Sequence, residues 1–587
     1  MSDRLSRPQA RLGAIDQAVA DANTAARLGA VEQALADVQR RLAALEAREL
    51  RSPASPAALA PSASESPWPL LGAGRPDLTT FVSLVGRTFV VLGGAYLLRA
   101  LTESGRIPGR GGVVLGFAYA VAWFGAADRA GMSRPLSSLF HGLAAVIISL
   151  PLLWEASAHF RLLSPPASAA MLMLITGLAL GVAWHRHLQS LAGVAVMGSI
   201  VTTAGLVVAT GRPLPFAAAL VTLGACTLWL SDARGWSWLR WPPALAANLL
   251  AIVLVGRAVV VPPQEPHGAV VALLLVFMAV YVASAMSRTL VAGERVRAFE
   301  IIQTPCAVGI GLLGALTVAA GEPGPVPISL GGLGLVGAAG SYVAAFGILR
   351  RRSAARANVV FFSSMAVALL LIGGHALLSG AALVAWCGGL AVTAAILGGR
   401  VAEPQLSLHA AVLGFAMAWV SGTLVWAAGV WLARGPWLPM SAAQVATVVV
   451  AAACLTIRPR TSETASADGP PLLVCSARFA LGVVLVIGIG GTAVWWLGPR
   501  VTGQPFDAGV FASLTTIVLA ASAVAAAALS RMTTCAEFRW LVYPVLVAGG
   551  LKLVVDDFRH SSPATLFAAL AVYGVALILA PRILRRF

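Results

Sequence analysis

Charged residues are scarce in this chain: Asp, Glu, Lys and Arg make up 11% of its 587 residues, against about 25% in soluble domains. Hydrophobic residues make up 58%, and the mean hydropathy is +0.84. A soluble fold of this size needs a polar surface that such a composition cannot supply. The shortage of charge therefore excludes a large soluble domain and indicates a membrane protein.

Lysine is almost absent, because Lys552 is the single lysine among 41 basic residues. The formal net charge is +17, yet the arginines are scattered through short segments between apolar runs. They do not form the stripe or patch that follows nucleic-acid phosphates. The sequence therefore predicts no nucleic-acid partner.

Recognisable reaction chemistry is missing as well. The six cysteines show no metal-ligand spacing, and there is no HExxH motif and no nucleophile elbow. The glycine-rich run at 331–340 follows no predicted strand and leads to no GK[ST], so close helix packing explains it better than a nucleotide. The sequence predicts no catalytic residue, metal site or cofactor, and it argues against an enzyme without excluding one.

Long apolar runs are abundant, and a helix needs about 20 such residues to cross the ~30 Å hydrocarbon core of a bilayer. The sequence predicts an all-α, polytopic integral membrane protein with about eighteen transmembrane helices. Two runs, 112–127 and 441–457, are short for a span, and the two runs around Gly380 form either one broken helix or a tight hairpin. The predicted spans are 81–101, 112–127, 136–160, 167–184, 190–210, 215–230, 239–261, 268–287, 299–320, 326–349, 359–379, 381–398, 406–432, 441–457, 477–497, 506–529, 538–555 and 563–584.

Basic residues alternate along the chain between successive connections. The even-numbered connections and the C-terminal tail, with their margins, hold 21 of them, whereas the odd-numbered connections and their margins hold 10. Short cytoplasmic loops carry the excess of Lys and Arg. The sequence therefore predicts that both termini lie in the cytoplasm.

Residues 1–50 are polar and alanine-rich, with no apolar core of a signal peptide. The pattern RLGAxxQAxAD occurs at residue 11 and again at residue 27. Apolar residues at alternating spacings of four and three predict a short coiled coil for self-association, and a lone amphipathic helix is the alternative. Residues 51–79, rich in Pro, Ser and Ala, predict a linker, and 80–587 form the polytopic membrane domain.

Ionisable groups inside or beside the hydrocarbon are costly and are therefore candidate pathway or ligand contacts. Arg87 lies about a turn and a half into the first span, where it either snorkels to the inner interface or contacts another charge or a substrate. Glu155 and His159 lie one turn apart in a helix that contains Pro151. They form either a proton-coupled site beside a kink or a pair in the outer headgroup layer.

The last outer connection holds Lys552, Asp556, Asp557, Arg559 and His560, with Lys552, Asp556 and either Arg559 or His560 on one helical face. One interpretation is an interfacial ladder of ion pairs. The other is an outward-facing site for an anionic head group or a sugar, with either aspartate as acid, base or ligand. The use of lysine matters because its pKa shifts readily on burial, whereas arginine stays charged.

Four stretches of the chain resemble an uncharacterised bacterial family of large multi-pass membrane proteins with an N-terminal coiled coil, a domain of unknown function. They are GRTFVVLGGAYLLRAL at 86–101, WHRHLQSLAGVAVMGSIVTTAGLVVATGR at 184–212, SDARGWSWLRW at 231–241 and GGLKLVVDDF at 549–558. The resemblance implies a bacterial cytoplasmic membrane. It implies no established activity and defines no functional residues.

Three functions stay open from the sequence. Transport or handling of a small molecule or lipid is favoured by the many spans, their Pro and Gly positions and the few intramembrane charges. A non-catalytic scaffold would assemble partners through the coiled coil. A membrane-embedded transferase on a lipid-linked substrate would depend on Asp556 and Asp557. All three place the chain in the lipid bilayer.

Overall fold

The computed structural model describes residues 108–131, 135–260, 265–320, 324–351, 356–401, 403–433, 437–457, 472–503, 506–532 and 537–585, with residues 86, 93, 94, 104 and 106. All of them belong to one compact unit, Thr79–Phe587. The predicted coiled coil at 1–50 and the linker at 51–79 lie outside the described residues. So do Arg87 and nearly all of the first predicted span.

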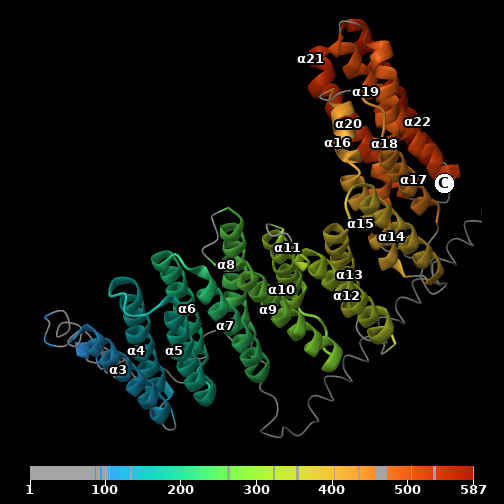
Figure 1. Cartoon of the computed structure of the whole chain (residues 1–587). Coiled ribbons are helices and arrows are strands. Elements are labelled where there is room, and N and C mark those ends of the chain that lie inside the picture. Colours follow the sequence, from blue (N-terminus) through green and yellow to red (C-terminus); the bar gives the residue numbers. More distant parts are fainter. Residues whose placement is uncertain are drawn as a thin grey trace, which may run out of the picture. The chain divides into compact units, whose positions relative to one another are not determined.

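Every regular element in the described part of the chain is a helix (Figure 1). The α-helices are α3 Gly109–Ala130, α4 Pro135–Trp154, α5 Pro165–Arg186, α6 Gln189–Thr210, α7 Pro213–Arg234, α8 Trp241–Val260, α9 His267–Met286, α10 Ala298–Val308, α11 Gly314–Ala319, α12 Val326–Tyr342, α13 Arg356–Leu377, α14 Gly380–Val401, α15 Pro404–Val420, α16 Thr423–Trp431, α17 Ala442–Thr456, α18 Leu472–Val501, α19 Ala508–Met532, α20 Glu537–Lys552, α21 Phe558–His560 and α22 Pro563–Arg585.

Short π-helical segments extend five of these helices. They are η2 Glu155–His159, η4 Ser287–Val291, η5 Gly309–Leu313, η6 Val343–Leu349 and η7 Leu553–Asp557. A 3-10 turn, η3 Ser237–Arg240, leads into α8. Each π segment adds a residue to a helical turn and so changes which side chains share a face, a device frequent at functional sites.

Fifteen helical segments in the described ranges are long and apolar enough to cross a membrane, or sixteen if one bent pair forms a single span. This confirms the all-α class and the many helices of spanning length. The count of eighteen stays a prediction, because nearly all of the first predicted span lies outside the described residues and α17 has only 15 residues. At 1.5 Å per residue, α17 reaches about 22 Å, which is shorter than the hydrocarbon core.

The chain breaks at a different place from the one considered in the sequence. Around Gly380, α13 and α14 are two separate helices of spanning length. The predicted single span 406–432 is instead divided into α15 and α16, which meet at 65°. Gly422 lies at the break with φ at +72°, a conformation that costs a side chain about 1–2 kcal/mol.

Glycine lets α12 and α13 approach each other closely, and the two helices lie side by side in Figure 1. A Cβ atom on Gly373 would lie 2.8 Å from the carbonyl oxygen of Gly331. One on Gly334 would lie 3.2 Å from the Cα of Gly373. The glycine-rich run at 331–340 therefore serves helix packing, as small residues commonly do between membrane helices.

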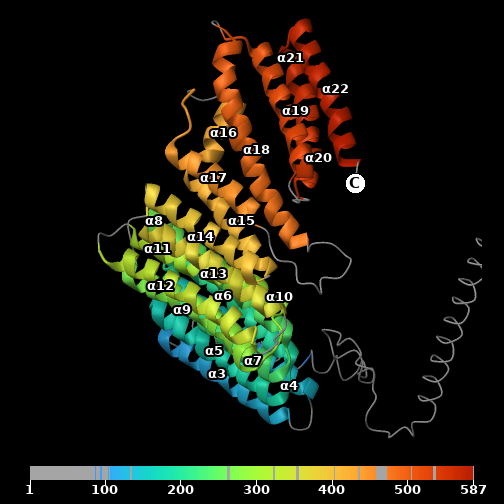
Figure 2. The same cartoon turned by 90° about the vertical axis from the view of Figure 1, so that its right-hand side faces the viewer.

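Helices pack mainly against helices that are near them in sequence. The substantial contacts within the described ranges join helices no more than three labels apart. At the C-terminal end, α19 packs against α18, α20 and α22 (Figure 2). This last group positions the aspartates and the lysine that the sequence singled out.

Candidate functional site at the Lys552 cluster

The cluster is built where α20 changes from α-helical to π-helical winding. Lys552 is the last residue of α20, and the π-helical η7 follows with Asp556 and Asp557 at its end. A π-helix places residue i+5 above residue i, where an α-helix would place i+4. This winding brings Asp557 as well as Asp556 within reach of the lysine.

The ammonium group of Lys552 has oxygen atoms from two helices around it. Its Nζ atom lies 2.7 Å from Oδ1 of Asp557 and 3.0 Å from Oδ2 of Asp556. On α19, the backbone oxygen of Ala512 accepts a hydrogen bond at 2.8 Å, and Oγ1 of Thr516 lies at 3.5 Å. The lysine therefore ties α20 and η7 to α19.

The two aspartates differ sharply in exposure. The side chain of Asp557 is 0% exposed, whereas those of Asp556 and Lys552 are 43% and 19% exposed. Asp556 contacts His560 on its other side, with 3.1 Å between Oδ1 and Nδ1. Oδ2 of Asp557 is buried without a hydrogen-bond partner among the described residues. Such an oxygen is costly, because a buried carboxylate normally uses both of its oxygens.

Hydroxyl groups of α19 lie beside the charged residues. Ser513, Thr515 and Thr516 are all buried. The hydroxyl of Ser513 lies 3.0 Å from that of Ser561, which donates to the backbone oxygen of Gly509 at 3.1 Å. The wall opposite Lys552 is therefore polar, although it belongs to an apolar helix.

The contacts of Lys552 limit which ligands the cluster can take. Two carboxylates face the ammonium group of Lys552, and the exposed Arg559 lies two positions beyond Asp557. Lys552 is engaged by both aspartates, so its ammonium group is not free to bind an anionic ligand. The arrangement favours a cationic or hydroxyl-rich ligand over the anionic head group considered from the sequence.

The other predicted site residues are not part of the Lys552 cluster. Glu155 is half-buried at the start of η2 and His159 is exposed at its end, with its ring 5.0 Å from that of Phe160. The helix continues through Pro151 and changes to π winding four residues later. The roles of Glu155 and His159 stay a prediction, and Arg87 lies outside the described residues.

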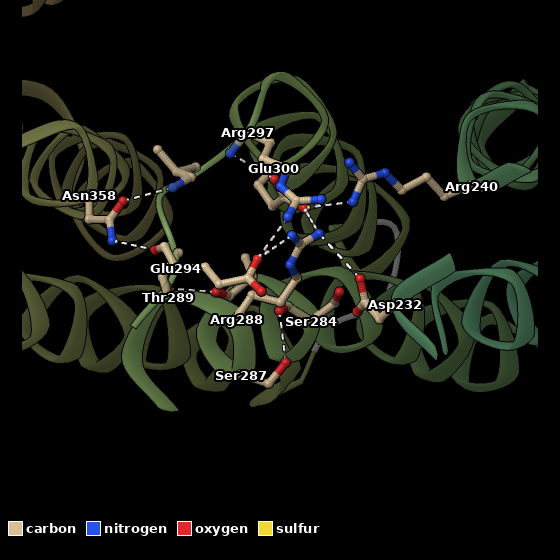
Figure 3. A network of polar contacts seen from close by, with 12 residues as sticks. Asp232, Arg240, Ser284, Ser287, Arg288, Thr289, Glu294, Arg297, Glu300 and Asn358 are labelled. Carbon is tan, nitrogen blue, oxygen red and sulfur yellow. Dashed lines mark hydrogen bonds and ion pairs between the residues drawn. The ribbon is translucent and has the colours of Figure 1, made fainter. Parts of the chain in front are cut away.

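A second polar cluster, missed in the sequence, joins η3, η4 and the start of α10 (Figure 3). Oε1 of Glu300 accepts hydrogen bonds from Arg240 at 3.1 Å and from Arg288 at 2.9 Å. All three side chains are buried. The guanidinium of Arg240 also lies 4.6 Å above the ring of Phe299.

Three further charges complete this second cluster. Arg288 donates to Oε2 of Glu294 at 2.6 Å and lies 3.3 Å from Asp232. Arg297 lies 3.2 Å from the same Glu294. The hydrogen bond from Arg288 and its charge hold the pKa of Glu294 below its usual value. Three arginines face three carboxylates, so the cluster is neutral.

Asn358 connects the second cluster to α13. Its Oδ1 accepts from the backbone nitrogen of Val296 at 2.8 Å, and its Nδ2 donates to the backbone oxygen of Glu294 at 2.8 Å. This cluster therefore pins the connection between η4 and α10, and its balanced charges suit a structural role. A signal existed in the sequence: arginines and glutamates flank the ends of successive spans, but nothing along the chain shows which ends meet.

The fold thus defines a class: an all-α chain with many helices long and apolar enough to cross a membrane. Within its described part, no group of three or more His, Cys, Asp or Glu residues is arranged to hold a metal ion. No family model, curated protein or solved structure matches the chain. The resemblance noted in the sequence therefore stays a prediction.

Proposed function

We propose that this protein transports or otherwise handles a small polar solute within the membrane, at the cluster of Lys552, Asp556 and Asp557. One observation carries the proposal: the fully buried carboxylate of Asp557 pairs with the only lysine of the chain inside the candidate span Phe538–His560. Ionisable groups in such a place are expensive and usually belong to a pathway or site.

Two features of the helices support transport over a passive role. The π-helical winding of η7 produces a change of register at the charged residues. The bent pair α15 and α16 is a discontinuous helix of the kind that transporters use. At its break, Oγ1 of Thr447 donates to the hydroxyl of Ser421 at 3.0 Å, and that hydroxyl lies 2.7 Å from Thr423.

We further propose a bacterial cytoplasmic membrane with both termini in the cytoplasm. The excess of arginine on even-numbered connections supports this orientation. Three ion pairs support a common side for several of these even-numbered connections, although they do not favour either orientation. They are Asp128 with Arg186, Asp232 with Arg288, and Arg350 with Glu403.

The proposal is tested by the variant Thr516→Cys, which places a thiol beside the ammonium of Lys552, in a background without the six native cysteines. A small membrane-impermeant thiol reagent is added to sealed vesicles from each side in turn. Thr515→Cys is the matched control, because Thr515 is equally buried but bonds to the backbone of its own helix. If the protein transports a solute through this cluster, the thiol at position 516 reacts with reagent added from either side. From each side it reacts at least ten times faster than the thiol at position 515.

Other outcomes separate the alternatives. Reaction from the outside alone supports the transferase that acts on a lipid-linked substrate at the outer face. Equal, slow reaction of both thiols means a sealed ion pair and overturns the proposal. The scaffold alternative depends on residues 1–50. If it is right, deletion of 1–76 abolishes the cellular phenotype that depends on the protein. The labelling of the Thr516→Cys variant stays unchanged.

A further inference from the structure

We propose that the oxygen atoms around the ammonium of Lys552 form a binding site for a monovalent cation, which Lys552 itself fills in the present conformation. The inference rests on the proposed function and names the class of ion that the site handles. Lys552 then acts as a tethered competitor of that ion.

The geometry supplies the first argument. Four oxygens surround the nitrogen of Lys552, namely Oδ1 of Asp557, the backbone oxygen of Ala512, Oδ2 of Asp556 and, farther out, Oγ1 of Thr516, at 2.7, 2.8, 3.0 and 3.5 Å. They come from carboxylates, a carbonyl and a hydroxyl, all hard oxygen ligands. In K⁺ channels, backbone carbonyl oxygens replace the hydration shell of the ion.

The ammonium group shows which size of ion the oxygens accommodate as they stand. Ca²⁺ prefers oxygens at about 2.3–2.6 Å and Mg²⁺ at about 2.0–2.1 Å. The three nearest oxygens lie 2.7–3.0 Å from the nitrogen of Lys552, so either divalent ion would require them to move inward. A large monovalent ion, close to an ammonium group in size and equal to it in charge, fits without rearrangement of α19.

The unused oxygen of Asp557 supplies a second, independent argument. Its Oδ2 is buried and has no hydrogen-bond partner in the described ranges, while Lys552 engages only Oδ1. A bound cation satisfies both oxygens of this carboxylate.

The exposures indicate where the lysine goes when the ion binds. Asp556 lies on the open side of the cluster and Asp557 on the closed side. The flexible four-carbon stem of Lys552 lets its ammonium move outward past Asp556 while the ion takes its place among the oxygens. Binding of the ion and insertion of Lys552 toward Asp557 are then mutually exclusive.

The test measures thermal unfolding of the full chain in detergent at constant ionic strength, with KCl exchanged for choline chloride. A ligand that binds only the folded protein raises Tm with its concentration. For the wild type, Tm rises with KCl. For Lys552→Met, which removes the competitor, the same rise occurs at a concentration at least ten times lower. Asp557→Asn shows no rise, and the exposed Arg559→Gln behaves as the wild type.

Equal responses of Lys552→Met to KCl and to choline chloride overturn the inference. If Lys552→Met does not fold, equilibrium dialysis with radioactive Rb⁺ compares the wild type with Asp557→Asn. One Rb⁺ per wild-type chain, lost in the variant, supports the site; no binding by the wild type overturns it.

The proposed function and the cation site are overturned by different results. A cation response with no labelling of the Thr516→Cys variant from either side leaves a structural ion and overturns transport alone. Labelling from both sides with no cation response leaves transport of another solute and overturns the cation site.

Discussion

Glu300 shows how one carboxylate organises its surroundings, because it accepts hydrogen bonds from two buried arginines on different segments. Removal of one member of a buried ion pair costs about 3–5 kcal/mol, since the remaining charge stays desolvated. A pair at the surface contributes about 0–1 kcal/mol. Burial therefore decides which charges of this network matter for stability.

Glu300→Gln keeps the shape of the side chain and removes the charge that faces Arg240 and Arg288. We expect the free energy of unfolding in detergent to fall by about 3–5 kcal/mol, with a lower midpoint in a thermal or SDS titration. Arg297→Gln is the control, because Arg297 is 54% exposed and its loss costs about 1 kcal/mol or less. Equal midpoints for the two variants would contradict a structural role for Glu300.

Glu294 makes stability depend on pH. Its pKa in the folded protein is depressed by Arg288, so its contribution is complete above the ordinary glutamate pKa of about 4.3 and is lost as the pH falls through the lower, folded value. We expect Tm to fall on acidification below about pH 4.5. The fall should be shallower for Glu294→Gln, measured in parallel from about pH 6 to about pH 3. Superimposable curves for the two proteins would refute this contribution.

Contacts between individual residues could be predicted only where the two partners lie close together in the sequence. Lys552, Asp556 and Asp557 lie within six positions of one another, so the sequence brings them together whatever the fold. Arg240 and Glu300 are 60 residues apart, and their contact depends on how helices meet. The sequence did not indicate that Asp557, five positions from the lysine, makes the shortest contact, because π-helical winding leaves no clear trace in composition.

At the scale of elements, the length of the apolar runs predicts the helices well, but it predicts breaks within helices poorly. The described helices follow the predicted spans within a few residues, because the hydrocarbon core demands length and apolarity from each. The bend between α15 and α16 was missed, since its polar residues Ser421 and Thr423 satisfy one another within an otherwise apolar run. Gly422 is the residue at this bend whose backbone requires glycine.

Gly422→Ala should destabilise the protein by about 1–2 kcal/mol, because a side chain is strained at φ +72°. Gly389→Ala is the matched control: Gly389 lies within α14, and a Cβ there meets no atom within 4 Å. That control should be neutral or slightly stabilising, since alanine favours helix over glycine. Thermal unfolding in detergent checks both, and a neutral Gly422→Ala would show that the break tolerates side chains.

At the scale of the whole molecule, the orientation of the chain is the prediction with the widest consequence. It assigns the Lys552 cluster to the outer face and the cluster around Glu300 to the cytoplasmic face. It depends on the alternation of basic residues, which uses no contact between helices. An odd number of miscounted spans between two points would reverse the assignment between them.

Fusions of reporter enzymes and fluorescent proteins check the orientation directly. Alkaline phosphatase, which is active only outside the cytoplasm, should be active when joined after residue 322 and inactive after residue 353. A fluorescent protein that matures only in the cytoplasm should fluoresce at the C-terminus. Activity at 353 together with inactivity at 322 would reverse the predicted topology in that region.

The packing of each helix against near neighbours in sequence has a consequence for biogenesis. Contact order is low when partners are close along the chain, and low contact order speeds folding. A helix that leaves the ribosome finds its partners already synthesised or about to follow, so the N-terminal helices can assemble while α22 is still being made. The Lys552 cluster, formed by α19, α20 and η7, would then be among the last parts of the protein to take shape.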